Sequence, residues 1–384
     1  MKIKVMSVFG TRPEAIKMAP LVQELAAWPE MESVCCLTGQ HRQMLDAVMD
    51  IFGLKAQYDL DIMEPQQTLS TITTKTLLGM ERVLQEAKPD LILVHGDTST
   101  TFAGALAAFY QKIPVGHVEA GLRTYDPYSP FPEEMNRTLV GDIASLHFCP
   151  TKANGENLKK EAVRGDIFIT GNTVIDAMRT TVRPNFVFSE EILNRLDYDH
   201  RKIITLTCHR RENYGGPMEA IMTAVRTIVE ADPSVEVVYP VHLSPVVQAC
   251  ARKYLGDMER VHLIAPLDVA QMHNLLARSY LVLTDSGGLQ EEAPAMGKPV
   301  LVLRRETERP EAIVAGTAKL AGVETKRIVA LTQTLLRDPT AYSRMARAVN
   351  PYGDGGACRR IAQAIAWRFG LTGERPADFS PNLK

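Results

Sequence analysis

Short apolar runs alternate with segments of helical period along almost the whole chain. The runs are continuous, which is typical of parallel strands covered by helices on both faces. In the first half this alternation predicts a doubly wound α/β domain. We expect its strands at residues 4–9, 34–37, 91–94, 115–118, 146–149 and 167–169. The expected helices cover residues 14–28, 43–52, 69–86, 101–110, 133–144 and 152–161.

The same pattern restarts near residue 200 and predicts a second domain of the same kind. Residues 179–199 between the two halves contain Pro184 and have no strong period, so they read as a linker. The fold class is therefore α/β, with two Rossmann-like doubly wound domains facing each other across a cleft. We assign residues 1–172 to the first domain, 173–365 to the second, and 366–384 to a closing helix end and tail. Strands of the second domain are expected at 203–207, 235–239, 261–264, 281–283 and 300–303, and helices near 218–230, 245–254, 269–277 and 290–296.

The length and composition of the chain indicate which kinds of binding partner and which cell compartment to expect. A chain of 384 residues exceeds one ordinary core, in agreement with two domains. The net charge of −2, without long runs of one sign, argues against nucleic acid or a membrane surface as partner. No apolar stretch is long enough to span a bilayer, and the first residues do not resemble a signal peptide. Six cysteines without metal-ligand spacing read as reduced thiols, so we expect a cytoplasmic protein.

Two predicted strand-to-helix turns are suited to anions. The first contains Gly10, Arg12 and Lys17, where a helix N-terminus would present free N–H groups beside two cations. It is either a capped helix with solvated side chains or a diphosphate contact. The second turn, DSGGLQEE at residues 285–292, offers Ser286, two glycines and, one turn later, Glu292. Exposed backbone N–H groups there favour an anion site over a plain turn.

Two other predicted strand ends carry a histidine followed two residues later by a carboxylate. They are His95 with Asp97, and His117 with Glu119. If the two strands are neighbours, the four groups converge. Three interpretations remain open at this point: a metal site, a pair of acid/base carboxylates, or a helix cap beside ordinary core histidines.

Other predicted turns carry further charged or imidazole side chains that are candidates for a functional site. Glu133 opens a helix after a proline-rigid turn; it either complements the helix dipole or supplies a third carboxylate. In the second half, CHRREN at residues 208–213 leaves the first strand, and His209 and Arg210 are candidates to meet phosphate charge. Similar strand ends carry His242 and Arg309.

Taken together, these segments resemble a known family. FGTRPEAIKMAPL, HGDT, GHVEAGLRT, SPFPEEMNR, HRREN, DSGGLQEEA and NPYGDG are similar to signature segments of the bacterial non-hydrolysing UDP-N-acetylglucosamine 2-epimerases, in the same order from residue 9 to residue 355. The resemblance implies a glycosyltransferase-B type fold and an isomerase that needs neither a metal nor another cofactor. It implies UDP-GlcNAc as substrate and as an allosteric activator, and a homodimer.

The resemblance also implies roles for individual residues. It assigns catalysis to Asp97, Glu119, Glu133 and His209. It assigns substrate binding to Arg12, Lys17, Leu267, Met272, Ser286, Gly287, Gly288, Glu292 and Arg309. The allosteric site would comprise Gln40, Gln43, Gln67, Glu133, Arg210 and His242. Many relatives have an arginine where this chain has Gln66, so a phosphate contact of the activator would be weaker here.

The implied reaction interconverts UDP-GlcNAc and UDP-ManNAc by inverting C2, and would supply ManNAc units for cell-surface polysaccharide such as teichoic acid linkage units. Loss of UDP from C1 acidifies the C2 hydrogen and gives a 2-acetamidoglucal, to which UDP is then added back. Alternatives are a hydrolysing epimerase that releases ManNAc and UDP, a glycosyltransferase of the same fold, and an inactive sugar-nucleotide sensor.

Overall fold

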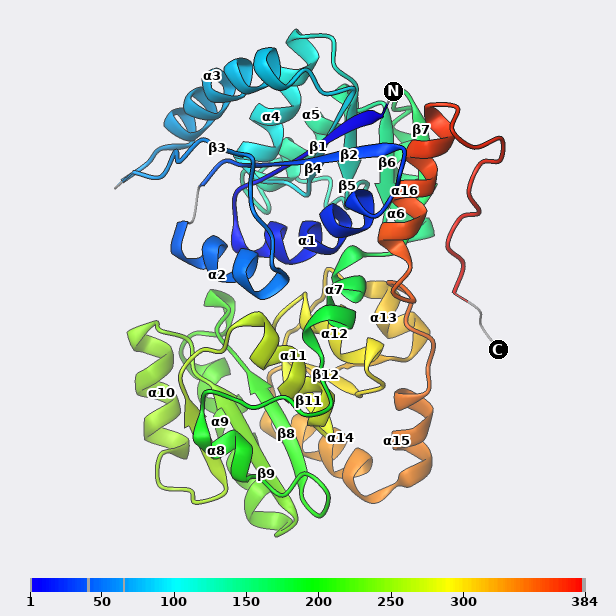
Figure 1. Cartoon of the computed structure of the whole chain (residues 1–384). Helices are drawn as coiled ribbons and strands as arrows, with labels where there is room; N and C mark the ends of the chain where they lie inside the picture. The colour runs from blue at the N-terminus through cyan, green and yellow to red at the C-terminus, as the bar shows by residue number, and fades with distance from the viewer. Residues whose placement is uncertain (1, 40–41, 65, 382–384) are drawn as a thin grey trace. The chain divides into compact units, whose positions relative to one another are not determined.

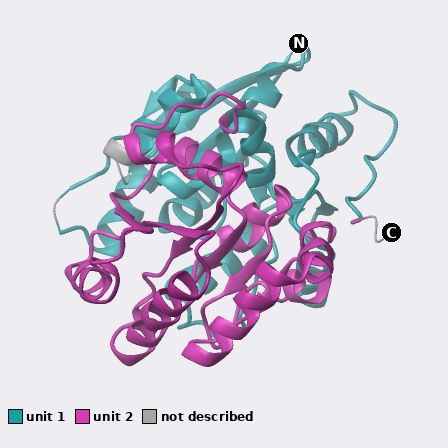
Figure 2. Ribbon diagram, turned by 90° about the horizontal axis from the view of Figure 1, so that it is seen from below, with its two compact units in different colours: residues 1–180, 352–380 teal, residues 181–351, 381–384 magenta. Residues whose placement is uncertain are grey.

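The structure, a computed structural model, describes residues 2–39, 42–64 and 66–381, with the backbone alone for residues 42–44. It divides into two compact units, coloured separately in Figure 2. Unit 1 comprises Met1–Thr180 with Tyr352–Ser380, and unit 2 is built from Thr181–Pro351. Each unit contains one parallel sheet with helices on both faces.

Unit 1 is built on a seven-stranded sheet, within the described residues, of order β3-β2-β1-β4-β5-β6-β7. Its strands pair in parallel. From β1 the sheet extends to β2 and β3 on one side and to β4 and the later strands on the other, which is the doubly wound arrangement predicted from the sequence. The strands are β1 (Ile3–Phe9), β2 (Met31–Leu37), β3 (Tyr58–Asp59), β4 (Leu91–His95), β5 (Val115–Val118), β6 (Leu146–Cys149) and β7 (Asp166–Ile169). The helices are α1 (Arg12–Ala26), α2 (Arg42–Phe52), α3 (Leu69–Ala87), α4 (Ser99–Tyr110), α5 (Glu133–Ile143), α6 (Lys152–Lys160), α7 (Thr173–Thr181) and α16 (Ala357–Arg368).

Alternate residues of the central strands pack into two separate cores. Leu91 and Leu93 of β4 join the core made with α1, α2 and α16. Ile92 and Val94 join the core made with α3, α4 and α5, which cover the other face (Figure 1). Because both faces are buried, the four consecutive positions from Leu91 to Val94 are all apolar. This double burial explains the continuous apolar runs in the sequence.

Unit 2 is also built on a parallel sheet with helices on both faces. Within the described residues the order of its strands is β10-β9-β8-β11-β12-β13. Its strands are β8 (Lys202–Thr207), β9 (Val235–Pro240), β10 (Val261–Ile264), β11 (Leu281–Thr284), β12 (Val300–Val302) and β13 (Ala318–Leu320). Its helices are α8 (Glu191–Arg195), η1 (Arg211–Asn213), α9 (Gly216–Ala231), α10 (Pro245–Leu255), α11 (Val269–Arg278), α12 (Leu289–Ala295), α13 (Pro310–Ala315), α14 (Thr325–Arg337) and α15 (Pro339–Ala346). Both sheets therefore match the predicted α/β class.

The division of the chain differs from the predicted boundaries at residues 172 and 365. The first unit continues to Thr180. Helix α16, which falls largely in the second domain by the predicted boundaries, belongs to unit 1. The reason is that Ile361 and Ile365 of α16 are fully buried in the core beside α1 and β1. Apolar residues on an isolated helix do not reveal which sheet they will cover.

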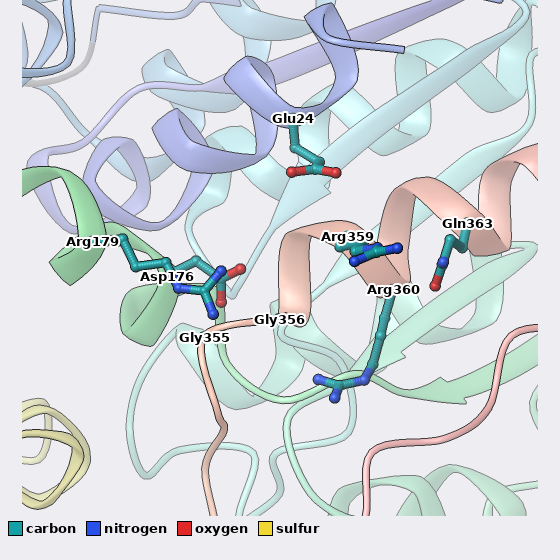
Figure 3. Close-up of a pocket in the computed structure, with 8 residues that line it drawn as sticks. All are labelled: Glu24, Asp176, Arg179, Gly355, Gly356, Arg359, Arg360 and Gln363. Carbon is teal, nitrogen blue, oxygen red and sulfur yellow. The ribbon is translucent and has the colours of Figure 1, made fainter.

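A polar cluster also fastens α16 to unit 1. The carboxylate of Asp176 in α7 accepts the backbone N–H groups of Ala357 and Cys358, at 3.1 and 3.0 Å. Arg360 donates from Nη1 and Nη2 to the two carboxylate oxygens of Asp354. Asp176 and Arg360 line a cavity of about 610 Å³, shown in Figure 3, and none of the predicted site residues is among its lining residues. Its polar groups cap and anchor a helix.

Two further properties concern the whole described chain. Within the described residues, every helix is too short or too polar to cross a bilayer. All six cysteines fall in that part and are free thiols, five of them buried.

Candidate active site

Asp97 and Glu119 lie just beyond the carboxyl ends of β4 and β5, which are neighbours in the sheet. Gly96 and Glu119 have positive φ angles of 70° and 62°, so the chain leaves the strand conformation at these residues. Arg137 of α5 joins the two carboxylates. Its Nη2 lies 2.7 Å from Oδ2 of Asp97 and 3.1 Å from Oε1 of Glu119. The two carboxylates thus share one buried cation, which the sequence analysis did not identify.

Glu119 is the most densely contacted carboxylate of this group. Besides Arg137 it pairs with Lys17 of α1, and Asn172 donates from Nδ2 to Oε2 at 3.1 Å. Burial alone raises the pKa of Glu119, but nearby positive charge, that of Lys17 first and of Arg137 as well, holds the pKa well below its ordinary value. Glu119 is therefore ionised at neutral pH. Lys17, assigned to the nucleotide from the resemblance, contacts a carboxylate in this structure.

The two histidines on these strands are buried. Burial lowers the pKa of His95 to about 4, although Glu119 at 3.8 Å acts in the opposite direction. Burial also lowers the pKa of His117 well below its usual value, and its Nε2 lies 2.8 Å from the Gly96 carbonyl. In the described part of the chain, no group of three or more His, Cys, Asp or Glu side chains is arranged to hold a metal ion. The metal interpretation therefore has no ligand set among those residues.

Glu133 and Glu134, the two carboxylates at the start of α5, differ in their hydrogen-bond partners. Oε2 of Glu133 is buried, and no described residue lies within hydrogen-bonding distance of it. Glu134 accepts the N–H groups of Thr124 and Tyr125 at 3.0 and 2.9 Å and thereby holds the loop before α5. Glu133 therefore has one oxygen without a hydrogen-bond partner among the described residues, whereas both Glu134 oxygens hold the backbone.

The start of α1 differs from the prediction. We expected free N–H groups there, but Oε2 of Glu14 accepts those of Gly10 and Thr11 at 2.9 and 2.7 Å. Its other oxygen accepts the hydroxyl of Thr98 at 2.6 Å, which ties α1 to the start of α4. An anion at this turn would meet Arg12, at the first position of the helix, and not these two amides. The prediction of free amides was wrong because the helix supplies its own cap from three residues further on.

In unit 2, His209 and Arg210 follow β8, and Asp285 follows the neighbouring strand β11. Asp285 is fully buried and accepts the backbone N–H groups of both residues at 2.8 Å. The His209 ring stacks on that of His242, with centroids 5.3 Å apart. Burial lowers the pKa of His209, while Asp285 opposes this shift. Asp285 opens the turn that the sequence predicts to bind an anion, but no local pattern indicates a role for this residue.

Among the remaining positions assigned to substrate binding in unit 2, Arg309 and Glu292 already have protein partners. Arg309 pairs with the buried Glu291, and Glu292 lies 3.4 Å from Nε2 of the buried His273. At Gly287 an added Cβ would lie 2.7 Å from Glu308, so a side chain there would displace that carboxylate. Ser286 donates its backbone N–H to Thr284. Both Leu267 and Met272 pack in an apolar cluster with Phe188, Leu193 and Leu275.

The residues assigned to an activator site are described in part. Arg210 binds Glu308 at 3.0 Å, and His242 is exposed and accepts the Ser244 N–H. Gln67 donates to the carbonyl of Ile62. Gln40 lies outside the described residues, as does the side chain of Gln43.

Comparison with known proteins gives a consistent result. A family model described as UDP-N-acetylglucosamine 2-epimerase matches residues 23–366. The chain is 56% identical over 380 residues to the UDP-N-acetylglucosamine 2-epimerase of Bacillus subtilis, covering 99% of each protein.

Two solved structures are also similar. One, from S. aureus in complex with UDP, is 49% identical with a TM-score of 0.89, over 99% of this chain and 100% of that one. The other, UDP-GlcNAc 2-epimerase from Neisseria meningitidis bound to UDP-GlcNAc, is 47% identical with a TM-score of 0.85, over 94% and 99%. With two parallel α/β sheets, the fold is of the glycosyltransferase-B type, as predicted. The chain belongs to the UDP-N-acetylglucosamine 2-epimerase family, a family of isomerases.

Proposed function

We propose that this chain interconverts UDP-GlcNAc and UDP-ManNAc by inverting C2 without hydrolysis. The observation that carries the proposal is the arrangement of Asp97 and Glu119 around the shared guanidinium of Arg137. Inversion requires a proton to leave one face of C2 and another to arrive on the opposite face, so two acid/base groups are needed. The complexes of similar proteins with UDP and with UDP-GlcNAc support the nucleotide sugar as substrate.

The C2 hydrogen of the sugar is not acidic in the ground state. Departure of UDP, with the C1–O electron pair, develops positive charge at C1, so a carboxylate can remove the C2 proton to give a 2-acetamidoglucal. Return of the UDP oxygen to C1 and delivery of a proton to C2 complete the inversion. An ionised Glu119 suits the role of proton acceptor or electrostatic partner at the start of this cycle. Asp97 and Glu133 are then the carboxylates that can provide the second proton transfer.

The leaving diphosphate requires positive charge. We assign this role to Arg12, Lys17, His209 and Arg309, with the backbone of Ser286, Gly287 and Gly288, and place the ribose at Glu292 and the uracil near Leu267 and Met272. Because Lys17 pairs with Glu119 and Arg309 with Glu291, substrate would have to draw these cations away from carboxylates. When Lys17 moves to the phosphate, Glu119 loses a neighbouring cation, so phosphate binding changes the electrostatic surroundings of Glu119.

The test is NMR of UDP-GlcNAc with the purified protein in deuterium oxide. We expect UDP-ManNAc that carries deuterium at C2, and the same rate in the presence of a chelator. Free ManNAc with UDP would indicate a hydrolysing epimerase, and turnover that needs an added sugar acceptor would indicate a glycosyltransferase. Product without deuterium at C2 would contradict the elimination scheme.

We also propose that a second UDP-GlcNAc activates the enzyme through Gln40, Gln43, Gln67, Glu133, Arg210 and His242. The uncharged Gln66 makes this activation weaker than in relatives with arginine at that position. Rates measured against UDP-GlcNAc concentration test this: a sigmoidal curve that steepens in Gln66→Arg supports it, and hyperbolic curves for both proteins contradict it. Sedimentation of the same sample tests the expected homodimer. The product would serve as a source of ManNAc units for cell-surface polysaccharide.

A further inference from the structure

Asp285 is placed beside His209 by the pairing of two strands. Thr284, the last residue of β11, is in register with Thr207, the last residue of β8, and their hydroxyls are 2.6 Å apart. The N–H of Asp285 donates to the Thr207 carbonyl at 3.2 Å. The carboxylate therefore sits next to the segment that leaves β8, although 76 residues separate Asp285 from His209.

The two oxygens of Asp285 have separate surroundings. Oδ2 accepts the N–H groups of His209 and Arg210 at 2.8 Å and the amide Nδ2 of Asn213 at 3.1 Å. Oδ1 is buried, has no hydrogen-bond partner among the described residues, and lies 3.5 Å from Nδ1 of His209. The buried Cys208 thiol also interacts with this carboxylate. A buried carboxylate oxygen without a donor is costly, and an imidazole N–H at this distance needs only a small rotation to supply one.

The plane of the His209 ring is set by its second neighbour. His242 stacks on it with an interplanar angle of 11°. The N–H of Ser244 donates to Nδ1 of His242 at 3.1 Å, so in the neutral ring that nitrogen is the acceptor and Nε2 carries the proton. Two stacked rings avoid repulsion when both are neutral. A neutral His209 has one N–H, and Nδ1 is the nitrogen that faces the carboxylate.

We propose that Asp285 is a positioning residue for His209: its carboxylate accepts the Nδ1–H of the imidazole and leaves Nε2 as the nitrogen that meets the substrate. The inference rests on the proposed function, in which His209 contacts the nucleotide sugar. The ring is 37% exposed, so its far edge is accessible while Nδ1 faces the buried side. The other titratable groups near the pair are His242, Arg210, Cys208 and Tyr239.

Asp285 also holds the backbone of the segment after β8, so loss of activity alone would not prove the positioning role. The first test therefore uses the wild-type protein. Its histidine ring nitrogens are labelled with ¹⁵N and observed by NMR at about pH 8, above the ordinary imidazole pKa. His209→Gln assigns the signals. We expect the Nδ1–H tautomer for His209; an Nε2–H tautomer overturns the inference.

The second test is Asp285→Asn, which keeps the shape and one oxygen acceptor. We expect the Nδ1–H tautomer to lose its dominance, and kcat to fall about 100-fold with KM changed less than about threefold. The matched control is Asn213→Ala, which removes one donor to Oδ2 and leaves Oδ1 facing the ring. We expect this variant to lose stability and to keep the tautomer.

An Asp285→Asn protein with an unchanged tautomer and kcat refutes the inference even if the wild type is a fully active epimerase. A wild-type protein that does not convert UDP-GlcNAc refutes the proposed function instead. The tautomer measurement on that protein still decides whether Asp285 orients the ring. The two proposals can therefore fail separately.

Discussion

Arg137 binds Glu119 at two points: Nη1 donates to its backbone carbonyl at 2.7 Å, and Nη2 to Oε1 at 3.1 Å. Both side chains are at least nine-tenths buried. One guanidinium therefore fixes the left-handed backbone turn at Glu119 and the orientation of its carboxylate. The same nitrogen, Nη2, reaches Asp97, so the relative position of the two carboxylates depends on Arg137.

The first prediction concerns this cation. Arg137→Met should lower the free energy of unfolding by about 3–5 kcal/mol, because it removes the cation shared by the buried Glu119 and by Asp97. It should also abolish measurable epimerisation. Arg137→Lys keeps the charge but loses the fork geometry, so we expect an intermediate loss. Chemical denaturation and the NMR assay measure the two effects. Arg82→Met, at an exposed position of α3, is the matched control, and equal losses in the two variants would contradict the prediction.

The second prediction separates the neighbouring carboxylates of α5. Glu133→Gln should reduce kcat roughly 100-fold and leave stability nearly unchanged, because the altered carboxylate has an oxygen without a protein donor. Glu134→Gln should cost about 1–3 kcal/mol of stability, because an amide NH₂ would face one of the two backbone N–H groups. Activity and thermal unfolding of both variants provide the comparison. The opposite pattern would exchange the roles of the two residues.

The third prediction is a pH dependence of stability due to His95. Its pKa is about 4 in the folded protein and near 6.5 in the unfolded chain, so the unfolded state binds the proton first as pH falls. Stability should be unaffected by this residue above pH 6.5 and should be lost progressively between about 6.5 and 4, by roughly 3 kcal/mol in total. His95→Phe should flatten the plot of unfolding free energy against pH in that window. A plot that keeps the wild-type slope would show that His95 does not take part.

The fourth prediction concerns Gly121, which follows β5. Its φ is +85°, and an added Cβ would lie 2.2 Å from the carbonyl oxygen of Asn154. Gly53→Ala is the control, because Gly53 also has a positive φ but no atom within 4 Å of the added carbon. We expect Gly53→Ala to cost about 1–2 kcal/mol and Gly121→Ala more than about 4 kcal/mol, as measured by denaturant unfolding. Similar costs for both would mean that backbone strain alone matters.

Several features of the site could be predicted from local patterns. The strand ends at His95 and His117 are recognisable because continuous apolar runs stop there and polar residues follow. Whether the two strands are neighbours was left open by the sequence, and the pairing of β4 with β5 answers that question. The short edge strands β3 and β13 were missed, since two or three residues carry too little pattern.

Long-range partners could not be predicted in this way. Arg137 lies in a segment that the sequence analysis examined, but nothing local shows that it turns toward Asp97 and Glu119. Asp285 looked like the first residue of an anion-binding turn and instead faces His209. Both contacts depend on which strands become neighbours, and that order is a property of the packed sheet.

The sequence by itself determined the α/β class, the restart of the pattern near residue 200, the family and the set of candidate carboxylates. These follow from periodicity and motifs, which are encoded within a few consecutive residues. The tertiary structure decided which unit α16 joins, which amides Glu14 occupies, and which charges surround Glu119. Those outcomes depend on burial and on contacts between residues far apart in the chain, because the free energy of a charged group is set by everything packed against it.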